Sequence, residues 1–206
     1  MIQQIDYTDE FEQFLKEECE KMECLSILHN YESKKKIKRS NYLGLPVIIM
    51  SGSTGILAAS SILTFPHAGL LIGGLNIITG IIKTIDTYFN YSKISETHRL
   101  VSLNYTKLMK FIQVQLSLER DSRINAYHLL DNVISDLDNL RTSEPIISNE
   151  AIENFKNTYP GDKYKNVRPS ILNGLTDIKI NKKTLLEFRR SHSSLSVETN
   201  PLGHSP

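Results

Sequence analysis

The sequence has no tryptophan and two cysteines, and over one long stretch it has no charged residue. Its 206 residues carry a formal net charge of +1, so bulk charge does not indicate a nucleic-acid partner. Cys19 and Cys24 would point about 140° apart on a helix, which is poor geometry for a disulfide. We therefore expect two reduced thiols and no metal site.

Motifs of catalysis and nucleotide binding are also missing. The sequence contains no GxxxxGK[ST], HExxH, GxSxG or CxxC. The stretch SGSTG (51–55) is rich in glycine, but no strand is predicted before it and no lysine follows it. The acidic N-terminal segment does not match a secretory signal. The sequence thus predicts a non-enzymatic protein with no catalytic, cofactor-binding or metal-binding residues.

The stretch without charge runs from Ser40 to Ile82, which is 43 residues. A helix that crosses a bilayer needs about 20 apolar residues, so the stretch is long enough for two crossings. Pro66 and His67 lie near its midpoint, and proline disfavours helix at the residue before it. We predict a transmembrane hairpin with its tip at this proline and with arms at about 43–65 and 68–89.

A buried helical hairpin inside a soluble domain is the competing interpretation. A helix on the edge of a soluble core normally has one polar face, whereas the first arm has no charged face at all. Its polar and small residues are of the kinds that membrane helices use for close packing. The residues expected to pack in this way are Ser51, Gly55, Ala59, Gly69 and Gly73.

Charges beside the arms predict the orientation in the membrane. A basic cluster precedes the first arm, and Lys83 and Lys93 follow the second. Because positive flanks stay on the cytosolic side, we expect an integral membrane protein with two spans and both termini in the cytosol. The basic cluster also has the chemistry to bind anionic headgroups. Its members are Lys34, Lys35, Lys36, Lys38 and Arg39.

The second arm is short and carries polar residues on one side. Only Ala68 to Ile82 is free of charge, about 22 Å of helix at 1.5 Å per residue. One interpretation is an interfacial Lys83–Asp86 pair with Asn76 bonded to the other arm. The alternative is a polar face that lines a pore or an oligomer contact. The face consists of Asn76, Thr79, Lys83 and Asp86.

The segments beside the hairpin predict further helices. Asp9 and Glu12 match a capping box at the start of an amphipathic helix. The helix of the second arm is expected to continue beyond 90 and then to form an antiparallel helical hairpin with the next one. His98 there is either a packed histidine or a ligand or proton relay. The two apolar seams are Ile94, His98, Val101, Tyr105, Leu108 and Ile112, and Ala126, Leu130, Val133, Leu137 and Leu140.

The predicted fold class is an all-α membrane protein, in which a two-helix transmembrane hairpin is joined to a cytosolic helical bundle. The bundle consists of the N-terminal helix and the antiparallel helical hairpin. Residues 1–39 form the amphipathic helix and basic flank, and 40–90 the transmembrane hairpin. Residues 91–160 form the helical hairpin and a short helix, and 161–206 a mostly irregular tail.

This layout resembles the SLATT superfamily of two-transmembrane proteins. The matching stretches are LGLPVIIMSGSTGILA (43–58), ETHRLVSLNYTKLMKFI (96–112) and DLDNLRTSEPIIS (136–148). The resemblance implies a membrane hairpin with cytosolic helices and, as in the bacterial members, a pore-forming effector. The chain also resembles uncharacterised membrane proteins of large DNA viruses, which would imply a host or virion membrane.

Two functions are consistent with these observations. The first is an oligomeric pore-forming or membrane-perturbing module. The second is a non-conducting membrane scaffold, or viral membrane component, that recruits partners through its cytosolic helices. The expected partners are the lipid bilayer, further copies of the chain and an unidentified cytosolic protein, with no nucleic acid.

Overall fold

A computed structural model describes residues 6–59, 67–160 and 169–173. These residues form α-helices and one short 3-10 helix, without any strand, so the prediction of an all-helical chain is confirmed for them. The predicted tip at Pro66 lies outside the described residues. The helices are α1 (Asp9–Ala59), α2 (Ala68–Phe89), α3 (Tyr91–Ser117), η1 (Arg120–Ser122), α4 (Ala126–Ser143), α5 (Asn149–Thr158) and α6 (Ser170–Asn173).

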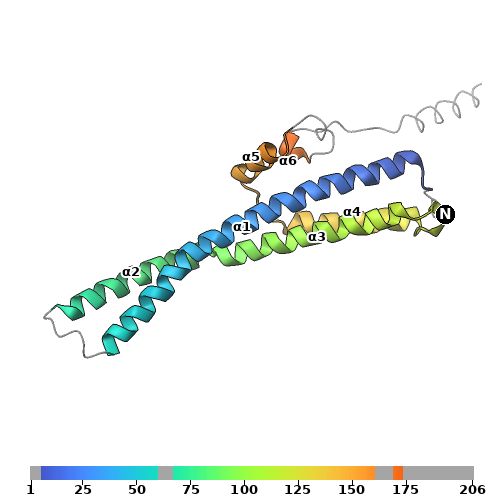
Figure 1. Cartoon of the computed structure of the whole chain (residues 1–206). Helices are drawn as coiled ribbons and strands as arrows, with labels where there is room; N and C mark the ends of the chain where they lie inside the picture. Colours follow the sequence, from blue (N-terminus) through green and yellow to red (C-terminus); the bar gives the residue numbers. More distant parts are fainter. Residues whose placement is uncertain (1–5, 60–66, 161–168, 174–206) are drawn as a thin grey trace, which may run out of the picture. The chain divides into compact units, whose positions relative to one another are not determined.

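Helix α1 is a single helix of 51 residues that continues through the basic flank and Pro46. At 1.5 Å per residue it is about 76 Å long. Figure 1 shows α3 beside the first half of α1 and α2 beside its second half. One continuous helix therefore links the region before the hairpin with the first arm.

The start of α1 differs from the predicted capping box. The helix begins at Asp9, and the hydroxyl of Thr8 accepts a hydrogen bond from the Phe11 backbone N–H at 3.2 Å. Thr8 is therefore the N-cap. The Glu12 carboxylate instead binds Arg120 and Arg123, which lie in the turn between α3 and α4, more than 100 positions further along the chain. A long-range ion pair has replaced the expected local bond.

The first half of α1 packs with α3 and α4 around one apolar core. The predicted seam of α4 is wrong at one position, because Leu129 is buried and Leu130 is only half-buried. Ile94 of the α3 seam is also half-buried. The core residues are Leu15, Cys19, Met22, Val101, Tyr105, Leu108, Ile112, Leu129, Val133, Leu137 and Leu140.

A second, smaller core lies on another side of α1. Leu28 of α1 packs there with Ala151 and Phe155 of α5, with Ile147 before that helix and with Leu172 of α6. Helix α6 lies within the segment 161–206 that was expected to be mostly irregular. The side chain of Ser148 caps α5 by accepting from the Ala151 N–H at 3.3 Å.

The predicted continuous helix after the second arm is interrupted at one residue. Asn90 has the left-handed conformation, with φ 46° and ψ 44°, which asparagine adopts more readily than most residues. Its N–H still bonds to the Asp86 carbonyl at 2.9 Å, and its own carbonyl accepts from Ile94 N–H at 3.2 Å. The interruption separates α2 from α3 without removing these backbone bonds.

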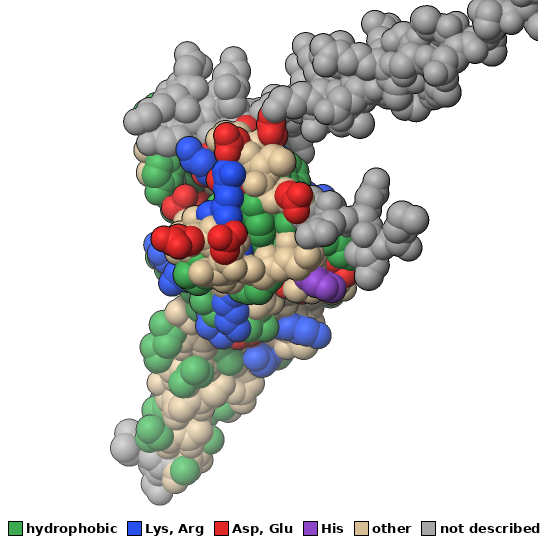
Figure 2. Space-filling view, turned by 90° about the vertical axis from the view of Figure 1, so that its right-hand side faces the viewer, with side chains coloured by type: hydrophobic (Ala, Val, Ile, Leu, Met, Phe, Trp, Pro, Cys, Tyr) green, Lys and Arg blue, Asp and Glu red, His purple; other side chains and the backbone are tan. Residues whose placement is uncertain are grey.

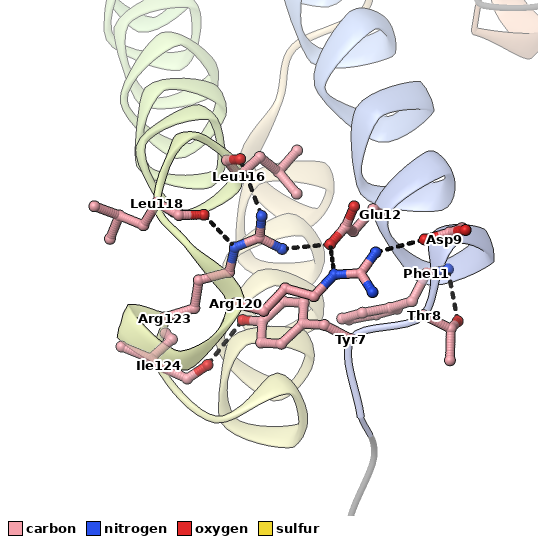
Figure 3. A network of polar contacts seen from close by, with 10 residues as sticks. All are labelled: Tyr7, Thr8, Asp9, Phe11, Glu12, Leu116, Leu118, Arg120, Arg123 and Ile124. Atoms are coloured by element: carbon pink, nitrogen blue, oxygen red, sulfur yellow. Dashed lines mark hydrogen bonds and ion pairs between the residues drawn. The ribbon is translucent and has the colours of Figure 1, made fainter.

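The turn between α3 and α4 is fastened to the start of α1 by two arginines (Figure 3). Arg123 donates to the Glu12 carboxylate at 2.6 Å and to the carbonyls of Leu116 and Leu118. Arg120 donates to Glu12 at 2.8 Å and also to Asp9. The network closes the end of the bundle that is formed by the first turn of α1 and the α3–α4 turn.

Candidate membrane hairpin and a buried polar junction

Two helical stretches are long and apolar enough to cross a membrane: α1, and α2 together with α3. Only 6% of the residues in the most apolar window of each are buried. The core helix of a soluble protein would be mostly buried. The apolar surface of the arms is therefore not covered by the described part of the chain.

The exposed apolar side chains are large and lie on both arms. In Figure 2 the charged side chains gather over the bundle, and the narrow end formed by the arms shows hydrophobic and uncharged atoms. Large contiguous apolar patches on a protein surface commonly mark a site that contacts lipid or another protein. The residues include Leu45, Ile48, Ile49, Ile56, Leu70, Leu71, Ile77, Ile78 and Ile81.

One outward face of α2 differs from the rest of the arm because its residues are small or polar. Successive steps of four and three place these residues within about 80° of one another on the helix. A methyl group added to any of its three glycines would meet nothing within 4 Å among the described residues. We call this the small-residue face; it consists of Gly69, Gly73, Asn76, Gly80 and Lys83, all exposed.

The predicted polar face of α2 is divided between two environments. Asn76 and Lys83 are exposed on the small-residue face, whereas Thr79 is buried and Asp86 half-buried. The Thr79 hydroxyl donates to the Leu75 carbonyl at 2.8 Å. Lys83 Nζ lies 3.1 Å from Asp86 Oδ2, so the expected pair of these residues is present. Of the four residues, the structure thus brings Lys83 and Asp86 into contact and leaves Asn76 and Thr79 in different surroundings.

The small residues of the first arm also point outward. Ser51, Gly55 and Ala59 are exposed, and Thr54 is the buried residue of this turn. The Thr54 hydroxyl donates to the Met50 carbonyl at 2.9 Å, so its polar atom has a partner within the helix. The predicted close packing of the small residues thus does not occur between the two arms of one chain, and it stays a prediction for contacts between copies.

The basic cluster is only partly available for headgroups. Lys34, Lys38 and Arg39 are exposed. Lys35 instead binds Glu150 and Ser148 of the α5 region, and Lys36 lies over the Tyr91 ring at 5.7 Å from its centroid. Three of the five predicted residues are therefore open to an anionic surface.

Within the bundle lies a group of buried polar side chains of which the sequence singled out His98 alone. His29 of α1 and His98 of α3 are fully buried, and their Nδ1 atoms are 2.9 Å apart. His29 Nε2 lies 3.4 Å from Glu144 Oε2, which also accepts from the Tyr105 hydroxyl at 2.7 Å. We call these four residues and Glu32 the polar junction.

Glu32 fastens the segment before α5 to α1. It is fully buried, and its Oε1 accepts from the backbone N–H and the hydroxyl of Ser148. Its Oε2 has no hydrogen-bond partner among the described residues. Burial opposes ionisation, but the bonds from Ser148 and the charges of Lys35 and Lys36 outweigh it, so the pKa of Glu32 is below its usual value.

The pKa values of His98, Tyr105 and Glu144 are also shifted. Burial, together with the neighbouring His29, lowers the pKa of His98 from 6.5 to about 4. Burial raises the pKa of the Tyr105 hydroxyl, and its bond to Glu144 adds to this rise. Burial alone would raise the pKa of Glu144, but the bonds from His29 and Tyr105 hold it below its usual value. His98 is thus packed and neutral at neutral pH.

Short side chains beside the junction let α1 and α3 approach closely. Ser26 and Ser102 exchange bonds with each other's carbonyl at 3.0 and 2.9 Å, and Ser95 donates to the Ser33 carbonyl at 2.8 Å. The described residues contain no group of three or more histidines, cysteines or acidic residues that could hold a metal ion.

Comparison with known proteins finds no match to this chain among family models, curated proteins or solved structures.

Proposed function

We propose that the chain is an integral membrane protein whose arms assemble with further copies into a pore-forming or membrane-perturbing module. Lipid would cover the large exposed aliphatic side chains of the two arms, because their transfer from water is favourable by about 25 cal/mol per Å². The three exposed basic residues before the first arm, Lys34, Lys38 and Arg39, would meet anionic headgroups. The resemblance to the SLATT superfamily agrees with this proposal and stays a prediction.

The observation that carries the oligomer is the exposed amide of Asn76. It lies near the middle of the charge-free part of α2, with glycines one turn away on each side along the small-residue face. An amide in hydrocarbon requires a hydrogen-bond partner, and small neighbours let a second helix come close enough to supply one. A second copy would present the same face, so the contact can be formed between identical arms.

A scaffold without conduction is the second candidate, and the Lys83–Asp86 pair favours it. Lys83 is bonded to Asp86 on its own helix, so it does not need a second arm to balance its charge. In this case Lys83 would extend toward the aqueous boundary, and the bundle would serve to recruit other proteins.

Ion flux through liposomes that contain the purified full chain separates the two candidates. A pore predicts leakage above protein-free liposomes, and it predicts that Lys83→Glu shifts the ion preference toward cations while Lys83→Leu changes conductance. Equal leakage from all three proteins would exclude Lys83 from the conducting path. No leakage from any of them would favour the scaffold.

The oligomer contact is tested separately by Asn76→Leu. This change should weaken chemical crosslinking between copies in liposomes by severalfold, since interhelical bonds of this kind contribute about 1 kcal/mol. Ile77→Leu, one position further along the same arm but on a lipid-facing side, is the matched control and should crosslink like the wild type. Equal crosslinking of both variants would contradict the role of Asn76.

A further inference from the structure

We propose that the His29–His98 pair is an acid-sensitive latch, which holds residues 144–158 against α1 at neutral pH and releases them when both histidines become charged. The latch concerns the region before and after the arms, so it does not depend on whether the arms conduct. Three parts of the chain meet at this point: α1, α3 and the segment between α4 and α5.

The latch rests on the geometry of the two rings. A separation of 2.9 Å between the Nδ1 atoms leaves room for one hydrogen, so one ring must donate and the other accept. His29 Nε2 faces the Glu144 carboxylate and is the donor there. With His98 neutral, both the bond between the rings and the bond to Glu144 can form, whether His29 is neutral or charged. A proton on both Nδ1 atoms would place two N–H groups head to head.

The charges around the pair come from every element that packs against it. Helix α1 contributes Glu32 and Lys36, and Glu144 follows α4, whose Arg141 acts on it. Tyr105 of α3 is neutral and donates to Glu144. The carboxylates favour a first positive charge, and Lys36 and the charge on the other ring oppose a second one.

Residues 144–158 are the part that can move away most easily. Their contact with α1 is less extensive than that between α1 and α3, and polar bonds hold them at Glu32, His29 and Lys35. Release would let water reach the charged rings, and it would uncover the apolar side of α5 and the part of α1 beneath it.

The two native cysteines report on this release. Cys24 packs against the small core formed with α5 and α6, whereas Cys19 is buried in the core with α3 and α4. A pyridyl disulfide labels thiols in acid, and peptide mass spectrometry separates the two sites. The labelling rate of each cysteine is measured for the full chain in detergent and for the chain unfolded in guanidinium at the same pH. The ratio of the two rates, the relative labelling, does not contain the effect of pH on the thiol itself.

The folded His98 binds its proton less tightly than an exposed histidine, so opening becomes more favourable as the pH falls from 6.5 toward 4. Cys24 is half-buried in the closed form, so its relative labelling should rise by up to about 20-fold between pH 7 and pH 5 by this linkage, with Cys19 staying protected. In His98→Gln the rise should be smaller than about twofold, because the histidine that binds its proton weakly in the closed form is gone. In His29→Gln the rise should be smaller than in the wild type but should not vanish, because burial, the larger cause of the low pKa of His98, remains.

His128→Gln is the matched control, since His128 is an exposed histidine on α4, and it should keep the wild-type profile. Circular dichroism at pH 7 establishes that each variant is folded. Three results would overturn the latch: Cys24 labelling that does not change between pH 7 and 5, an unchanged rise in both glutamine variants, or labelling of Cys19 in step with Cys24. The last result would indicate unfolding of the whole bundle.

Discussion

Helix α1 has two halves with opposite surroundings. Residues 9–33, the bundle half, bury Leu15, Met22 and Leu28 against other helices, and they bury two ionisable groups, His29 and Glu32, with polar partners. Residues 43–59, the arm half, contact α2 but leave Leu45, Ile48, Ile49 and Ile56 exposed. One continuous helix thus contains a region that other helices of the chain cover and a region that the described part of the chain leaves exposed.

The comparison separates two origins of helix stability. The bundle half is stabilised by apolar burial and by satisfied buried polar groups, so its residues are specified by their neighbours. In the arm half, the buried hydroxyl of Thr54 is satisfied by carbonyls of its own helix. A helix whose backbone polar groups bond within the helix can lie in an apolar solvent without a particular protein neighbour. The proposed membrane supplies that solvent.

The largest expected effect is on the core of the bundle half. Leu15 is 0% exposed, and Leu15→Ala should lower the free energy of unfolding of the bundle in detergent by about 2–5 kcal/mol, because it leaves a cavity. Ile48 is 69% exposed, and Ile48→Ala should change it by less than about 0.5 kcal/mol. Denaturant unfolding followed by circular dichroism measures both. A similar loss of unfolding free energy in Leu15→Ala and Ile48→Ala would contradict the difference between the two halves.

Two exposed isoleucines sharpen the comparison. Ile77 of α2 is 66% exposed and Ile134 of α4 is 49% exposed. Ile77→Lys should oppose membrane insertion, since a lysine near the centre of a span costs about 2.5–3.5 kcal/mol. Ile134→Lys should leave insertion unchanged, because it would stay in water. The fraction of each protein in washed membranes checks this, and an equal loss for both would contradict the proposed boundary.

A smaller effect is expected where the α3–α4 turn is fastened to α1. The Arg123 side chain is 7% exposed and bonds to Glu12 and two carbonyls. Arg123→Gln should lower the free energy of unfolding of the bundle by about 1–3 kcal/mol, because it removes the charged bond to Glu12 and the bonds to the carbonyls of Leu116 and Leu118. Arg120→Gln, at an exposed position, should cost less. Thermal unfolding in detergent compares them, and the reverse order would be inconsistent with this network.

Much of the fold could be predicted because its signals are local. The charge-free stretch and Pro66 predicted an arm at about 68–89, and α2 spans Ala68–Phe89. The 3.5-residue spacing predicted most of the buried positions of α3 and α4. Leu129 was missed because the exact rotation of α4 depends on its packing and not on the average spacing.

The polar junction could not be predicted, because it depends on how helices distant in the sequence align. The sequence singled out His98, but its partner His29 lies 69 positions away, and no periodicity links two separate helices. The division of the polar face of α2 has a similar cause. Spacing places Thr79 and Lys83 on adjoining turns, but contact with α1 decides that Thr79 is buried and Lys83 is not.

Carbonate extraction of membranes that contain the full chain tests the central claim most directly. If lipid covers the exposed side chains of both arms, the protein stays in the membrane pellet at alkaline pH and is released by detergent. If a soluble partner or another protein surface covers them, carbonate releases the chain into the supernatant. Quantitative release by carbonate would contradict the account.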